Sequence, residues 1–188
     1  MEYTMEQRGA LIREACLASE SKNPHEIFKS IARQDFIRIH GPEHHILDGA
    51  CFLAAFRNAG GKVDLEKGLE HMLREGSRMP GATCGLWGVC GAVTSLGTAL
   101  AFLEDTGPLS GDDSWGSHME FTSGALRDLA AVGGPRCCKR DGFLTLRAAV
   151  AYAKERYGVE METDGLFCGF FSQNPQCIEK RCPFYPKT

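Results

Sequence analysis

The three cysteines near the end of the chain have the spacing of a metal-binding segment. Cys168, Cys177 and Cys182 follow the pattern Cx8CxxxxCP. Thiolates on an irregular segment can converge on one centre because such a segment, unlike a helix, can wrap inward. The proline after the last cysteine resembles the end of ferredoxin-type ligand runs. We expect these cysteines to bind a metal; the alternative is three buried cysteines that act as small apolar side chains.

The adjacent pair Cys137 and Cys138 is the obvious source of a fourth ligand, because three thiolates leave a tetrahedral set incomplete. Neighbouring side chains leave the backbone in different directions, so one thiol of the pair would bind while the other stays free. We assign Cys138 to the metal and Cys137 to catalysis. Arg136, Lys139 and Arg140 should lower a thiol pKa. The alternative is basic residues that merely solvate a loop.

A glycine-rich segment carries two further cysteines. Cys84 and Cys90 alternate with Gly85, Gly88 and Gly91 just before an apolar run. Glycines allow close approach of a ligand, and amides at a helix start can face negative charge. We therefore expect a cofactor loop with these glycines at the cofactor and both thiols in catalysis. The segment is neither a Walker A loop nor a dinucleotide-binding GxGxxG. Glycines that only permit close helix packing are the alternative.

Histidines cluster at another expected helix start. His40, Glu43, His44 and His45 lie within six residues. His44 shares a helical face with apolar residues three and seven positions later, so it should point to the core and act as a proton carrier. We place His40, Glu43 and His45 at the cofactor. The HExxH spacing of a zinc protease is absent. A buried histidine that hydrogen-bonds a carbonyl remains the alternative.

Helices must position these groups. Apolar periodicity predicts them over 3–20, 23–34, 41–61, 64–78, 90–105, 117–135 and 141–158. Their expected starts are Asn23 as N-cap with Pro24 after it, Pro42 as first residue, Asp64, a capping box of Ser117 and Glu120, and Asp141. The segment 90–105 is apolar nearly all round, so we expect it in the middle of the core.

The last part of the chain has no helical period. From Gly165 onward, cysteine, proline and phenylalanine dominate. We therefore predict a mostly α fold: a compact multi-helix domain over 1–164, with an irregular cysteine-rich segment over 165–188 packed on the same domain.

Composition limits the class of protein. The 188 residues, 43% hydrophobic with a net charge of −3, fit one globular domain. Neither a signal peptide nor an apolar run of ~18 residues is present, so we expect a cytoplasmic protein without membrane contact. Nine cysteines in a reducing compartment argue for metal ligation or reactive thiols over disulfides. The slight negative charge also makes nucleic-acid binding unlikely.

The segments "HGPEHH", "CGLWGVCGA", "RCCKRD" and "NPQCIEKRCPFYP" together resemble an uncharacterised bacterial and archaeal family with a domain of unknown function. Members of that family are sometimes linked to SAM-dependent methyltransferase or radical-SAM modules. The resemblance implies that the matching positions belong to the family pattern: His40, His44, His45, Cys84, Cys90, Cys137, Cys138, Cys168, Cys177 and Cys182. It implies no established activity.

The leading hypothesis is an iron–sulfur protein, with a 4Fe-4S cluster favoured over zinc because the cysteines exceed four. It would be a sulfur transferase or desulfurase acting on a small-molecule or sulfur-donor substrate. The alternative is a non-enzymatic adaptor stapled by zinc, serving a methyltransferase or radical-SAM partner. A metal-free redox protein is a further option, through a disulfide between Cys137 and Cys138, although no CxxC is present.

Overall fold

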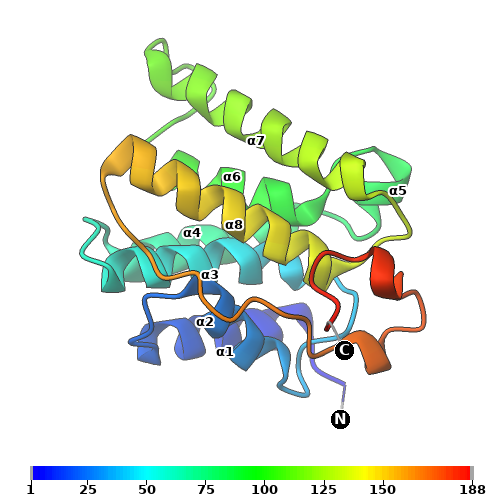
Figure 1. Ribbon diagram of the computed structural model, residues 1–188. Helices are drawn as coiled ribbons and strands as arrows, with labels where there is room; N and C mark the ends of the chain where they lie inside the picture. The colour runs from blue at the N-terminus through cyan, green and yellow to red at the C-terminus, as the bar shows by residue number, and fades with distance from the viewer. Residues whose placement is uncertain (1, 187–188) are drawn as a thin grey trace.

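The computed structural model describes residues 2–186, where helices joined by irregular segments are present and no β-strand occurs (Figure 1). This confirms the predicted fold class. The elements are α1 (Met5–Ala18), α2 (Pro24–Ala32), α3 (His44–Asn58), α4 (Leu65–Arg78), α5 (Thr83–Leu86), α6 (Gly91–Leu103), α7 (Asp113–Val132), α8 (Cys138–Tyr157) and the 3₁₀ helices η1 (Phe171–Gln173) and η2 (Glu179–Arg181). Among these residues, no helix has the length and apolar character needed to cross a bilayer.

Helix α3 lies at the centre of the bundle. Every residue from His44 to Phe56 is buried, and α3 packs against α1, α2, α4, α6 and α8. The middle position expected for segment 90–105 is thus held by α3, with α6 beside it. The two helices approach closely at Gly49, whose amide donates to Ser95 Oγ (2.9 Å). A Cβ on Gly49 would lie 2.6 Å from the Ser95 carbonyl oxygen, so only glycine fits.

Local capping explains some helix starts. Asn23 caps α2 with Pro24 at the first position, and Asp64 caps α4 through the Lys67 amide, as predicted. Helix α3 begins at His44, two residues after Pro42.

The predicted starts of α7 and α8 are wrong. Helix α7 begins at Asp113 with Asp112 as its cap, and Ser117 instead donates to the Asp113 carbonyl. Helix α8 begins at Cys138, three residues before Asp141, and the Cys137 sulfur accepts the cap hydrogen bond. The earlier start of α8 determines where each thiol of the pair points.

The C-terminal segment returns to the start of α8. After Gly158 the chain runs back past α2 to the N-terminal end of α8, where η1 and η2 lie (Figure 1). The segment is fixed to α2 by hydrogen bonds from Asn23 Nδ2 to the Asp164 carbonyl (3.2 Å) and from Lys29 Nζ to the Gly165 carbonyl (3.1 Å). Phe170 and Phe184 are buried in the same core as the helices. This path carries the three C-terminal cysteines to Cys137.

Candidate functional site

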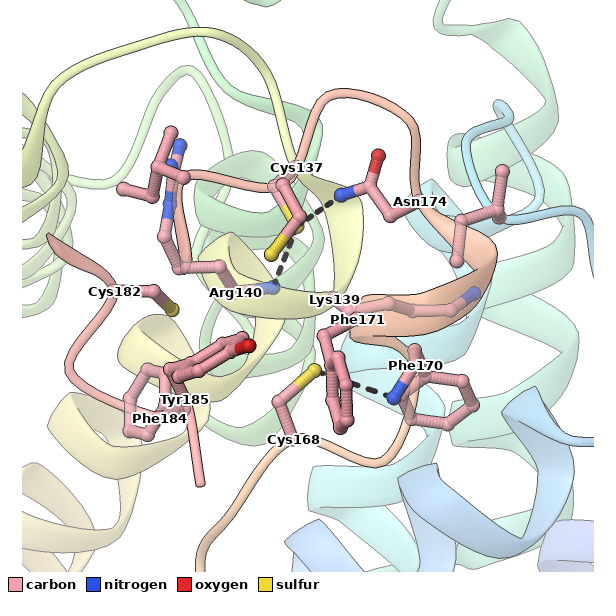
Figure 2. Close-up of a pocket in the computed structure, with 13 residues that line it drawn as sticks. Cys137, Lys139, Arg140, Cys168, Phe170, Phe171, Asn174, Cys182, Phe184 and Tyr185 are labelled. Carbon is pink, nitrogen blue, oxygen red and sulfur yellow. Dashed lines mark hydrogen bonds between the residues drawn. The ribbon is translucent and has the colours of Figure 1, made fainter. Parts of the chain in front are cut away.

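Four cysteines from two distant parts of the chain line one cavity, which we call the tail cavity. Its thiols belong to Cys137, Cys168, Cys177 and Cys182, and its walls include Ile39, Lys139, Arg140, Phe170, Phe171, Asn174, Ile178, Phe184 and Tyr185. Figure 2 shows the sulfurs of Cys137, Cys168 and Cys182 turned toward the interior of the pocket. The cavity volume is about 20 Å³, which is room for about one water molecule.

Three of the four sulfurs accept backbone N–H groups. Arg140 N donates to Cys137 Sγ (3.4 Å), Phe170 N to Cys168 Sγ (3.4 Å) and Glu179 N to Cys177 Sγ (3.3 Å). The side-chain amide of Asn174 adds a second donor to Cys137 Sγ (3.5 Å; Figure 2). Donors of this kind stabilise negative charge on sulfur, as around metal-bound thiolates.

Two thiols of this cavity, those of Cys137 and Cys168, nevertheless have raised pKa values. Burial raises the pKa of Cys137, and the Arg140 amide and charge offset only part of that rise. The pKa of Cys168 is raised by burial and by its neighbours Cys182 and Cys177. The expectation that basic neighbours lower the pKa of Cys137 is therefore wrong, because desolvation outweighs them.

The thiols surround a space rather than meet at a point. Within residues 2–186, no three His, Cys, Asp or Glu side chains lie close enough together to hold a single metal ion. The ligands of an iron–sulfur cluster bind different iron atoms, so they stand farther apart than the ligands of one ion. Four thiols are a suitable donor set for a thiolate-ligated centre. A cluster would require the C-terminal segment 165–186, which we call the tail, to move outward, because the cavity is small.

A second cavity, with a volume of about 230 Å³, lies beside the first. Its thiols belong to Cys84, Cys90 and Cys138, and its other side chains with titratable groups are Arg38, His40, His44, His45, Asp48, Arg136 and Asp141. The structure thus brings together most of the groups expected at a catalytic site. The positions expected for the two adjacent cysteines are reversed. Cys137 lies with the C-terminal cysteines and Cys138 lies in the second cavity, because α8 begins between the two residues.

His44 contacts a buried lysine that sequence reasoning did not place at the site. Lys139 is 1% exposed, and its Nζ lies 2.9 Å from His44 Nε2 and donates to the Arg38 carbonyl (2.9 Å). Desolvation lowers the pKa of Lys139 to about 8. Burial and Lys139 hold the pKa of His44 well below its usual value, so its imidazole is neutral. Lysine is rarely buried, so no local pattern predicts this contact.

Asp48 is a second group that sequence reasoning missed. It is fully buried, and neither carboxyl oxygen has a hydrogen-bond partner among the described residues. Its Oδ1 lies 3.9 Å from His44 Nδ1. Burial raises the pKa of Asp48 well above its usual value. A buried acceptor without a donor is costly to the stability of the fold.

Asp141 binds the thiol of the α6 N-cap. Cys90 Sγ donates to Asp141 Oδ2 (3.8 Å), and Asp141 Oδ1 accepts from Arg140 Nε (2.9 Å). Burial and the nearby carboxylate raise the pKa of Cys90. Asp141, expected only as a helix cap, is therefore part of the second cavity.

His40 connects the two cavities. Its Nε2 lies 3.0 Å from Asn174 Oδ1 on the tail, and its Nδ1 accepts from the Cys138 amide (3.5 Å). Because Asn174 also donates to Cys137 Sγ, one short hydrogen-bonded path runs from the tail cavity to the second cavity. The same path fixes the tail against the start of α8.

Of the residues expected at the cofactor, His45 lines the second cavity but Glu43 does not. His45 Nδ1 lies 3.3 Å from the Met79 carbonyl oxygen. The Glu43 carboxylate is buried and bound by the Arg38 guanidinium (2.6 Å) and amide (2.7 Å), so it does not line the cavity. The structure therefore gives Glu43 a structural contact in place of the expected cofactor contact.

The three glycines of the expected cofactor loop have different surroundings. Gly91 leaves room for the His45 ring, which a Cβ would strike. Gly88 has a positive φ of 69° and shapes the turn before α6. Nothing lies within 4 Å of a Cβ on Gly85 or Gly88.

Comparison with known proteins places the chain in a family. No curated protein and no solved structure is similar to it. The sequence pattern of one family, described as a family of unknown function (DUF5714), matches residues 12–185 and thus covers α2 to α8, the second half of α1 and nearly all of the C-terminal segment. Both cavities lie within that span. The chain therefore belongs to this family of unknown function.

Proposed function

We propose that this protein binds an iron–sulfur cluster in the tail cavity, through Cys137, Cys168, Cys177 and Cys182. One observation carries the proposal. Thiols from two segments that are far apart in the chain, Cys137 and the three C-terminal cysteines, line one cavity, and three of the four sulfurs accept backbone N–H groups. Core cysteines without a ligand have no need of such donors.

The walls of the tail cavity support a charged centre. Four thiolates around iron leave a net negative charge, and two cationic side chains, Lys139 and Arg140, line the same cavity. Phe170 and Phe184 cover the site and are buried. An aromatic shell keeps water from the centre, which tunes its reduction potential.

A bound cluster would supply one-electron and sulfur chemistry next to the second cavity. The Cys137–Cys138 peptide joins the two sites directly, since each thiol lines a different cavity. The thiols of Cys84, Cys90 and Cys138 offer sulfur nucleophiles there. We propose that the protein is a sulfur transferase or desulfurase acting on a small sulfur-containing molecule, with His44 and Lys139 holding the wall between the sites.

A zinc staple is the second candidate, favoured by the small volume of the tail cavity, about 20 Å³. One ion needs less outward movement of the tail than a cluster does, although its four thiolates would have to close to a tetrahedron. In that case the protein would be an adaptor for a methyltransferase or radical-SAM partner.

Anaerobic purification followed by iron, sulfide and zinc analysis separates the two candidates. The cluster proposal expects a brown protein with iron and acid-labile sulfide in equal amounts, about four of each per chain. A colourless protein with one equivalent of zinc would support the adaptor. A protein that acquires neither metal, even after reconstitution, would contradict both.

A further inference from the structure

The second cavity is reached from the surface through an open groove of about 660 Å³. The two spaces share Cys84, Cys90, Arg136 and Asp141 as lining residues, so they adjoin at these side chains. Leu126 and Leu129 of α7 form an apolar wall of the groove. A small molecule in the groove can therefore reach Cys84 and Cys90 without crossing the tail cavity.

Cys90 is the best-placed thiol on this path. It is the N-cap of α6, a helix of 13 residues, and has extended backbone angles (φ −79°, ψ 133°). Its side chain makes no cap hydrogen bond to α6, and Asp141 Oδ2 accepts its S–H. The carboxylate fixes the direction of the thiol.

Two arginines make the groove attractive to an anion. Arg140 is 5% exposed; its Nε binds Asp141 and its Nη2 binds the Pro135 carbonyl (3.0 Å), but its Nη1 has no partner among the described residues. Arg136 is exposed and lines both spaces. A buried guanidinium N–H without an acceptor is costly, so an anionic ligand would complete this site.

We propose that the second cavity accepts the outer sulfur atom of a small anionic persulfide or polysulfide, with Cys90 as the acceptor. The inference rests on the sulfur-handling function proposed above and names its substrate class. Three thiols along the path select for sulfur chemistry, and the arginines select for negative charge. The thiols and the arginines together therefore select a donor that is both sulfur-containing and negatively charged.

The transfer step balances without an external oxidant or reductant. The Cys90 sulfur forms a bond to the outer sulfur of the donor, and the sulfur–sulfur bond of the donor breaks. Its electron pair leaves with the donor thiolate, which takes up the proton lost by Cys90. The products are a persulfide on Cys90 and the donor thiol. Arg140 Nη1 and Arg136 stabilise the negative charge of the donor during the step.

The test uses inorganic polysulfide on the anaerobically purified full chain, followed by alkylation, digestion and mass spectrometry. The added sulfur should lie on Cys90. The Cys90→Ser variant should lose it, whereas the control Cys16→Ala, a core cysteine outside both cavities, should keep it. Arg140→Gln should slow labelling by about tenfold or more. A second arm with glutathione persulfide tests whether an organic donor is used.

Three outcomes would overturn the proposal: no added sulfur on wild-type protein, equal labelling of Cys90→Ser, or oxidation of Cys90 and Cys138 to a disulfide without sulfur uptake. Iron and sulfide analysis of the same samples reports separately on the cluster. Labelling of Cys90 in a protein that holds no iron would support this inference and contradict the cluster proposal. A protein with a full cluster but no labelled Cys90 would support the cluster proposal and contradict this inference.

Discussion

Cys137 and Cys138 are adjacent in the chain but line different cavities. The Cys137 sulfur accepts from Arg140 N (3.4 Å) and Asn174 Nδ2 (3.5 Å), next to the C-terminal cysteines. Cys138 is the first residue of α8, and its thiol faces the histidines. Successive side chains at a helix start point in different directions, so a vicinal pair can serve two sites. The pair thus connects the proposed metal site to the proposed substrate site.

Removal of metal from the purified protein should release the tail. Among the described residues, the cysteine-rich segment contributes only Phe170 and Phe184 to the core and is otherwise held by hydrogen bonds such as those of Asn23 and Lys29, whereas the helices supply most of the core residues. Chelation should therefore make segment 165–186 sensitive to protease, while helix content by circular dichroism stays the same. A tail equally protected with and without metal would show that the metal does not fix it.

The Asp48→Asn variant should be more stable than the wild type at pH 8. Burial raises the pKa of Asp48 in the folded state. The contribution of this residue to the stability of the protein is therefore present at low pH and is lost as pH rises through the raised pKa. An uncharged isostere avoids this cost, and we expect a gain of about 1–3 kcal/mol in urea unfolding. The exposed control Asp128→Asn should change the stability by less than about 0.5 kcal/mol. A less stable Asp48→Asn protein would show that the carboxylate has a stabilising partner.

Acidification should destabilise the metal-free protein. Burial lowers the pKa of His25 from 6.5 to about 4, so the unfolded chain binds a proton that the folded chain rejects. The stability it contributes is present above pH 6.5 and is lost as pH falls toward 4. From pH 7.5 to 5 the loss should be about 2 kcal/mol from this residue alone. The His25→Gln variant should show a shallower dependence on pH; identical slopes would remove His25 from the explanation.

The contact between α3 and α6 should not tolerate a methyl group at Gly49. A Cβ there would lie 2.6 Å from the Ser95 carbonyl oxygen. Gly49→Ala should therefore cost about 1–3 kcal/mol by chemical denaturation. Gly124→Ala on α7, where nothing lies within 4 Å of a Cβ, should instead stabilise by about 0.5–1 kcal/mol. Similar effects of the two changes would mean that the helices do not approach as closely as described.

Local signals were sufficient for part of the fold. Asn23 and Asp64 cap their helices as predicted because a cap depends on residues within one turn. The start of α8 was missed because cysteine is an uncommon N-cap and Asp141 is a usual one. Placing the start at Asp141 leaves both thiols of the pair in a loop, where nothing distinguishes them. The true start at Cys138 decides which thiol meets the tail.

The candidate site was predictable only where residue type indicates chemistry. Cysteines and histidines were found, since their clusters are visible in the sequence. The burial of Lys139 and Asp48 was not predicted, because charged residues are normally exposed and only tertiary packing buries these two. Asn174 was missed for a similar reason: its contacts with His40 and Cys137 join segments that are distant in the chain.

The metal content of two matched variants, Cys137→Ala and Cys138→Ala, is the most direct measurement of the central claim. Both should be purified anaerobically and analysed for iron, sulfide and absorption in parallel with the wild type. If Cys137 completes the tail cavity, Cys137→Ala should lose most of the cluster, whereas Cys138→Ala should keep a wild-type content. The reverse pattern, or equal metal content in both variants, would contradict the assignment.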